Sequence, residues 1–171
     1  MNKYFLVFFL LISFAFSDSF KDLDFGASRE VFFNHFKGID IKQVKKSLFG
    51  QKVYSFEGTY YDKPADFSIY FKDNQMYKVE VLIKVDKISK TLIMDLSVSD
   101  LYGMEYMSLY YRMIKALGYP KSGKGDLGDV KSKYVSAIWQ KNGALIELVL
   151  KGDKHMMDLL VIHCIKSSVD K

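Results

Sequence analysis

The sequence predicts an α+β fold of two tandem units, each with one helix followed by three strands of an antiparallel sheet. Two segments, near residues 28–37 and 99–118, have the apolar spacing of helices, and each is followed by runs of alternating apolar and polar residues. Because one helix covers only part of a three-stranded sheet, we expect the two units to join side by side, with both helices on one face.

The first unit is expected to begin with a helix over residues 28–37. Ser28 is a favourable N-cap for it, and Gly38 is a favourable stop. Residues 41–49 predict a second, short helix, because their apolar side chains share one helical face.

Three strands are expected next, at residues 53–60, 67–72 and 77–85. Turns are predicted between them at residues 62–64 and 73–74, where Asp, Asn and Pro are concentrated. The third strand has the most regular alternation of apolar and polar residues in the chain, which is typical of a strand with one buried face.

The second unit is expected to start with a long helix capped by Ser99 or Asp100 and ended by Gly118. Its apolar residues recur with helical spacing and predict a single buried stripe. The residues of this stripe are Tyr106, Leu109, Tyr110, Met113, Ile114 and Leu117.

A loop rich in Gly and Lys is expected to lead from this helix to about residue 131. The three strands of the second unit follow at residues 135–139, 145–151 and 157–166. Asn142-Gly143 is typical of a tight hairpin turn between the first two of them.

The first seventeen residues predict export from the cytosol. Lys3 precedes the apolar run of residues 4–16, and Ala15 and Ser17 have the spacing that a signal peptidase recognises. We therefore expect residues 1–17 to be a secretory signal peptide.

The remaining residues, 18–171, are expected to form a single domain of two repeats, about 18–90 and 91–171. A lipoprotein would need a Cys where the chain has Asp18, so no stable membrane anchor is expected after cleavage. Cys164 is the only cysteine and excludes an intramolecular disulfide. A periplasmic or secreted bacterial protein is the expected class.

Two segments of the first unit have a pattern found in bacterial envelope proteins. Residues 25–31, FGASREV, and residues 70–79, YFKDNQMYKV, combine a capped helix start with an aromatic hairpin. In this respect the chain resembles the small outer-membrane-assembly lipoproteins and the tandem-repeat β-lactamase inhibitory protein. The resemblance implies an exported, non-enzymatic module that binds other proteins through a sheet face or hairpin tips.

The helices should leave one face of the sheet open, and this face is the candidate surface for a partner. On it we expect Tyr70, Lys78, Glu80 and Lys84, which occupy the polar positions of two neighbouring strands. Tyr111, on the outer side of the second helix, is a further candidate because Tyr is favoured at interfaces.

Catalytic chemistry is not expected. Residues 118–125 imitate a phosphate-binding loop, but Gly125 stands where Ser or Thr should hold Mg²⁺. His163 and Cys164 are neighbours on a strand and should point to opposite faces, with Cys164 expected in the core.

An enzyme hypothesis would rest on His155, Asp126 and Asp129 together with His163 and Cys164. The aspartates lack calcium-loop spacing and the three histidines of the chain lack metal-site spacing. We therefore expect no enzyme activity, no cofactor and no metal.

Charge narrows the class of partner. The chain has a net charge of +5, but Arg29 and Arg112 are its only arginines, which argues against nucleic acid. Weak contact with anionic lipid or cell-wall polymer stays open. The expected partner is another protein of the envelope or of a host. The alternative is a carrier of a hydrophobic small molecule or lipid, because the core should be rich in aromatic residues and Met.

Overall fold

The computed structural model describes six segments of the chain, and the statements below concern these segments. They are residues 25–44, 51–85, 97–125, 134–141, 143–152 and 157–165. The expected signal peptide at residues 1–17 lies outside them. No helix in the described segments has the length and apolar character needed to cross a membrane.

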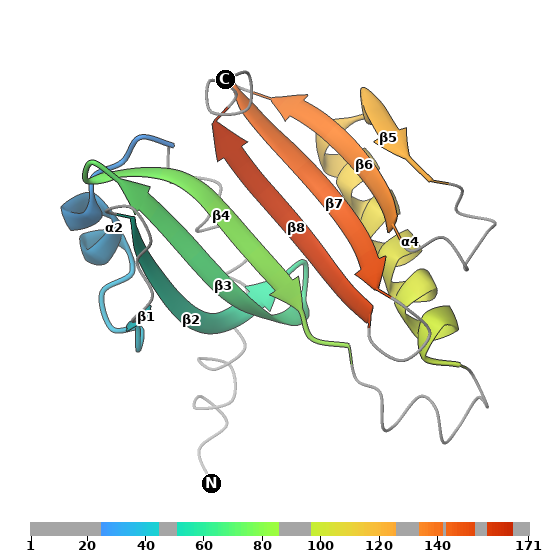
Figure 1. The fold of residues 1–171 in the computed structure, drawn as a ribbon, viewed down its shortest axis with the longest axis horizontal. Helices are drawn as coiled ribbons and strands as arrows, with labels where there is room; N and C mark the ends of the chain where they lie inside the picture. The colour runs from blue at the N-terminus through green and yellow to red at the C-terminus, as the bar shows by residue number, and fades with distance from the viewer. Residues whose placement is uncertain are drawn as a thin grey trace, which may run out of the picture.

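One antiparallel sheet of eight strands forms the body of the described structure, with the strand order β1-β2-β3-β4-β8-β7-β6-β5 (Figure 1). Two helices accompany it, α2 (Arg29–His35) and α4 (Val98–Leu117). The strands are β1 (Lys42–Val44), β2 (Lys52–Tyr60), β3 (Lys63–Lys72), β4 (Gln75–Ile83), β5 (Ser122–Lys124), β6 (Tyr134–Lys141), β7 (Ala144–Gly152) and β8 (Met157–Ile165).

The expectation of two tandem helix-plus-three-strand units is wrong. The described residues form one continuous eight-stranded sheet with two helices, and β4 pairs directly with β8 in its middle. Two further strands, β1 and β5, extend the sheet at its outer edges. Each has only three residues, all exposed, so neither has the apolar alternation by which a strand is recognised in a sequence.

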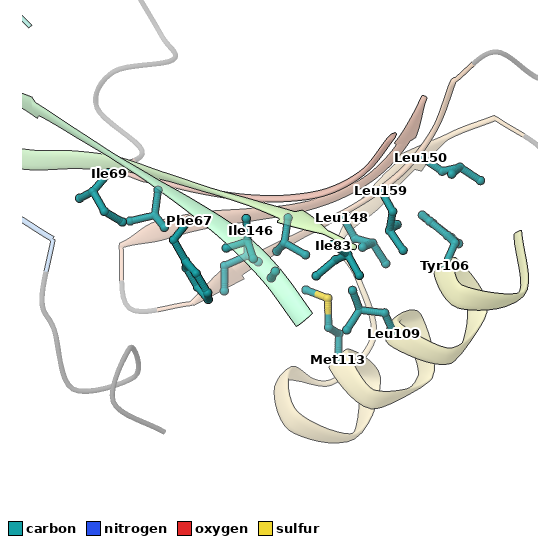
Figure 2. Close-up of a cluster of buried hydrophobic side chains, with 14 of the residues drawn as sticks. Phe67, Ile69, Ile83, Tyr106, Leu109, Met113, Ile146, Leu148, Leu150 and Leu159 are labelled. Atoms are coloured by element: carbon teal, nitrogen blue, oxygen red, sulfur yellow. The ribbon is translucent and has the colours of Figure 1, made fainter. Parts of the chain in front are cut away.

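Both helices pack on the same face of the sheet, which we call the helix face. Residues that are directly opposite each other across the strands point to the same side, and one such buried row on this face joins five strands. Its members are Phe67, Val81, Val161, Leu148 and Ala137. The ring of Phe32 on α2 lies 5.5 Å from that of Phe71, between ring centroids. In Figure 2, Tyr106, Leu109 and Met113 of α4 point toward Leu148 and Leu159.

The first helix starts as predicted and ends earlier. The Ser28 side chain accepts a hydrogen bond from the backbone N–H of Val31, which caps α2, and the helix ends at His35 with Phe36 as its C-cap. The predicted second helix over residues 41–49 is wrong for residues 42–44, which form strand β1, where Gln43 lies opposite Tyr54. Hydrogen bonding of residues 42–44 to the edge of β2 stabilises them as a strand more than their weak helical pattern favours a helix. Residues 45–50 lie outside the described segments.

The long helix begins at Val98, and its cap lies two residues before Ser99, the nearer of the two predicted caps. Ser97 is the N-cap: its hydroxyl accepts from the backbone N–H of Asp100, whose carboxylate accepts from the backbone N–H of Ser97. Gly118 ends the helix with a φ of 84°, as predicted. Leu109 and Met113 are buried in the predicted stripe, whereas Tyr111 is 62% exposed.

The predicted loop after this helix contains strand β5, so the expectation of an irregular connector is corrected. Lys121 donates its backbone N–H to Ile138, and its side chain donates to Gln140. An added Cβ at Gly123 would lie 2.5 Å from the carbonyl oxygen of Ser136. Glycine therefore permits this close approach of β5 to β6.

Candidate functional site: the open sheet face

The side of the sheet opposite the two helices is the candidate site, and we call it the open face. The structure places Tyr70, Lys78 and Glu80 there together. The Tyr70 hydroxyl donates to Glu80 Oε2 at 2.5 Å, and Lys78 Nζ lies 2.6 Å from Glu80 Oε1. Lys78 Nζ also lies 5.0 Å from the centroid of the Tyr70 ring. We call Tyr70 and Glu80 the first Tyr–Glu pair, and Lys78 contacts both of its residues.

A β-bulge shapes this group. The pairing of β3 with β4 shifts between Tyr70 and Phe71, so that Lys78 lies opposite Tyr70 while Met76 lies opposite Phe71. Tyr77 is left unopposed and is half-buried, whereas Met76 is buried in the core. The regular alternation predicted for residues 77–85 would put Tyr77 on the same side as Val79, and it fails at Tyr77 because the bulge adds a residue.

A second Tyr–Glu pair, which was not predicted from the sequence, lies on the open face. The Tyr134 hydroxyl on β6 donates to Glu147 Oε1 on β7 at 2.7 Å. Strand alternation in residues 134–141 and 144–152 puts both residues on the polar side, but only the hairpin register brings them together. In that register Tyr134 lies opposite Lys151, and Glu147 lies opposite Ile138.

Tyr134 covers two other residues of the open face. To reach Glu147, its side chain must cross the level at which Ser136 and Val149 lie opposite each other. This crossing accounts for the burial of both residues, although no described helix lies on this side.

The two glutamates lie at one level of the sheet. Glu80 on β4 and Glu147 on β7 are both directly opposite Ile162 on β8, the strand between them. Adjacent strands are about 4.8 Å apart, so the two Cα atoms are separated by roughly 10 Å. Two carboxylates therefore flank one isoleucine at the centre of the open face.

An apolar strip runs through this centre. Its side chains are half-buried or exposed and come from four adjacent strands. They are Leu82, Leu145, Leu160, Ile162 and Ile138. The most exposed is Leu82, at 36%. The open face thus combines aliphatic side chains with charged groups that are fixed by hydrogen bonds.

The first Tyr–Glu pair is held in one ionisation state. Burial alone would raise the pKa of Glu80, but hydrogen bonds from Lys78 and Tyr70 outweigh burial and lower this pKa. Burial and the hydrogen bond to Glu80 raise the pKa of Tyr70. At neutral pH the carboxyl group is therefore an anion, and the phenol is its hydrogen-bond donor.

The structure does not bring the other two predicted residues to this centre. Lys84 lies at one end of the open face, where its Nζ is 2.7 Å from Asp66 Oδ1 and 3.2 Å from Glu57 Oε1. Tyr111 lies on α4, which packs on the opposite side of the sheet. The predicted group therefore separates into a central trio, a lateral lysine and an unrelated helical tyrosine.

His163 and Cys164 point to opposite faces as predicted, but their expected places are reversed. Cys164 lies opposite Lys78 and belongs to the open face, whereas His163 lies opposite Val79 on the helix face. There its Nε2 lies 3.1 Å from the Tyr60 hydroxyl. The register between β4 and β8 decides which neighbour faces the core, and the strand's own sequence does not contain that information.

The described residues do not assemble the groups that an enzyme hypothesis would use. Burial raises the pKa of the Cys164 thiol, and His163 lies on the other side of its strand. Asp126, Asp129 and His155 lie outside the described segments. Within those segments, no three His, Cys, Asp or Glu side chains are grouped for a metal ion.

Comparison with family models, with curated proteins and with solved structures gives no significant match. The geometry of the open face is therefore the basis for proposing a function.

Proposed function

We propose that the protein is an exported binding module that recognises another protein through its open face. The observation that carries this proposal is an apolar strip, from Leu82 to Ile138, bounded by two Tyr–Glu pairs and uncovered by any described helix. Exposed apolar surface with a polar rim is typical of protein interaction sites, and Tyr is favoured in them.

The charges of this face favour a protein over a nucleic acid or an anionic polymer. Lys78 and Lys84 are both held in ion pairs with carboxylates of the same sheet. The face therefore offers few unpaired cations to a row of phosphates, and it presents anionic glutamates as well. Weak contact between anionic surfaces and lysines elsewhere on the chain stays a prediction.

Export is supported by the apolar run and cleavage-site spacing of residues 1–17. N-terminal sequencing of the protein recovered from the periplasm or medium tests this part of the proposal. A mature chain that starts at Asp18 is the expected result. Intact protein found only in the cytosol would contradict export and leave recognition by the open face to its own test.

Site-specific photocrosslinking in the cells that make the protein tests recognition directly. A photoreactive amino acid is placed at Leu82 on the open face and, as a control, at the exposed Lys115 on α4. We expect a discrete crosslinked protein from position 82 only. No crosslinked protein from position 82, or the same protein from both positions, would contradict the proposal.

The hydrophobic-ligand carrier stays a prediction from composition. Native mass spectrometry of the purified protein tests it, because a carried lipid would add its own mass to that of the polypeptide.

A further inference from the structure

We infer that the open face receives a basic side chain of its protein partner, an arginine or lysine, seated between Glu147 and Glu80 above Ile162. The inference rests on the proposed function and specifies the chemistry of the partner at that surface.

The two glutamates of the open face differ in their charged partners. Glu80 is neutralised by Lys78, whose Nζ lies 2.6 Å from its carboxylate. Glu147 is half-buried and is held only by the Tyr134 hydroxyl, and it forms no ion pair within the described segments. Lys151 also acts on Glu80, whose pKa it helps to lower, but no ion pair offsets the carboxylate charge of Glu147 within the described segments.

The charge of Glu147 affects the binding free energy most strongly when a partner docks on the open face. A partner that covers the apolar strip removes water from Glu147, and an unpaired carboxylate without water is strongly unfavourable. A cation on the partner offsets this cost, whereas a neutral or acidic group there does not. Charge complementarity therefore selects a partner with a basic side chain at this point.

The geometry suits a long basic side chain. Glu80 and Glu147 are separated by two strand spacings with Ile162 between them, so a cation above Ile162 can bind one carboxylate and interact with the other. The aliphatic stem of Arg or Lys can pack on Ile162 and Leu160 while its charged head reaches Glu147. The apolar strip thus contacts the aliphatic stem of the partner's side chain, and the Glu147 carboxylate binds its charged head.

Methyl NMR of the mature protein, residues 18–171, tests the inference with defined probes. The probe is the peptide acetyl-Leu-Arg-Leu-amide, and its control carries citrulline, which keeps the shape of arginine without the charge. The Ile162 methyl signal, assigned with the variant Ile162→Val, is followed during titration. We expect the arginine peptide to shift this signal and the citrulline peptide to bind at least about fivefold more weakly.

Two charge variants distinguish binding of the arginine peptide at Glu147 from its nonspecific electrostatic attraction to the protein. Glu147→Gln is expected to weaken binding of the arginine peptide about fivefold, as loss of an exposed ion pair does. Asp158→Asn removes one negative charge from an exposed position of the same face and is expected to leave binding within about twofold of wild type. Equal binding of both peptides, or equal effects of both variants, would overturn the inference.

The protein concentration is varied in the same experiment to test whether a second copy of this chain is the occupant. Shifts of Ile162 that grow with protein concentration before any peptide is added would show self-association and overturn the inference. If a crosslinked partner is recovered from position 82 while the arginine peptide fails, the proposed function stands and only the basic side chain is refuted.

Discussion

The Tyr60 hydroxyl, at the end of β2, lies 3.1 Å from Nε2 of His163 on β8, although β3 and β4 separate these two strands in the sheet. Both side chains are on the helix face by their register, so the sheet must curl to bring them together. A second link acts in the same region, where Arg112 of α4 donates to the carbonyl oxygen of Tyr61 and to Asp62. The β2–β3 hairpin is thereby tied to β8 and to the long helix.

This tyrosine–histidine contact predicts a pH-dependent stability. Burial lowers the pKa of His163 from 6.5 to about 4, so between these values the unfolded chain binds a proton that the folded chain does not. The free energy of unfolding should therefore fall as pH is lowered from 6.5 to about 4. Urea unfolding followed by circular dichroism across this range measures the slope.

The variant His163→Gln provides the control for that slope. It cannot titrate, so the part of the slope between pH 4 and 6.5 that His163 contributes should disappear. Glu80, whose pKa is lowered, contributes stability that is lost at more acidic pH, and this part should persist. Wild type and variant with identical slopes between pH 4 and 6.5 would show that His163 titrates normally.

Two methionines of α4 test how the helix packs on the sheet. Met113 is fully buried, whereas Met104 is 53% exposed on the same helix. Met113→Ala should lower the free energy of unfolding by about 2–5 kcal/mol, because it removes core contacts and leaves a cavity. Met104→Ala should change it by less than about 0.5 kcal/mol. Chemical denaturation of both variants checks this contrast, which similar losses would contradict.

Two glycines test edge strand β5. Gly123→Ala places a Cβ against the carbonyl oxygen of Ser136 and should destabilise the protein by about 1–3 kcal/mol as β5 shifts from β6. Gly103, inside α4, has free space for a Cβ, so Gly103→Ala should stabilise by up to about 1 kcal/mol. Thermal unfolding of the two variants should therefore move in opposite directions. A neutral Gly123→Ala would argue against close pairing of β5.

The start of α4 can be checked by removing single hydroxyls. Ser97→Ala should cost about 1 kcal/mol, because it removes the acceptor for the backbone N–H of Asp100. Ser99→Ala should cost only a few tenths of a kcal/mol, because Ser99 lies within the first turn. Urea denaturation gives both values, and a larger loss at Ser99 would favour the cap originally predicted from the sequence.

Alternation predicted much of the open face because side chains along a strand change sides at every residue. It placed Tyr70 on the polar side of β3 and Lys78 and Glu80 on the polar side of β4. The turn at Asp73 and Asn74 alone would put Tyr77 opposite Tyr70, and the bulge brings Lys78 there instead. Both turn residues have positive φ, as such turns require. The nearby bulge at Tyr77 was not predictable in this way, because a bulge depends on both strands.

Other features depend on pairings between residues far apart in the chain. The meeting of β4 with β8 puts Cys164 on the open face and sets Glu80 and Glu147 on either side of Ile162. Nothing within β8 alone distinguishes this register from one shifted by a single residue, which would exchange its two faces. The short edge strands β1 and β5 were missed for a related reason, since each is defined only by the strand beside it.

The most direct test of recognition by the open face is the affinity of the partner recovered by crosslinking. Leu82→Arg puts bulk and positive charge on the apolar strip, whereas Val31→Arg makes the same change at an exposed apolar residue of α2. With both variants folded, we predict that Leu82→Arg weakens partner binding by at least about tenfold and that Val31→Arg leaves it within about twofold. Unchanged binding by Leu82→Arg, or an equal loss in both variants, would contradict recognition by the open face.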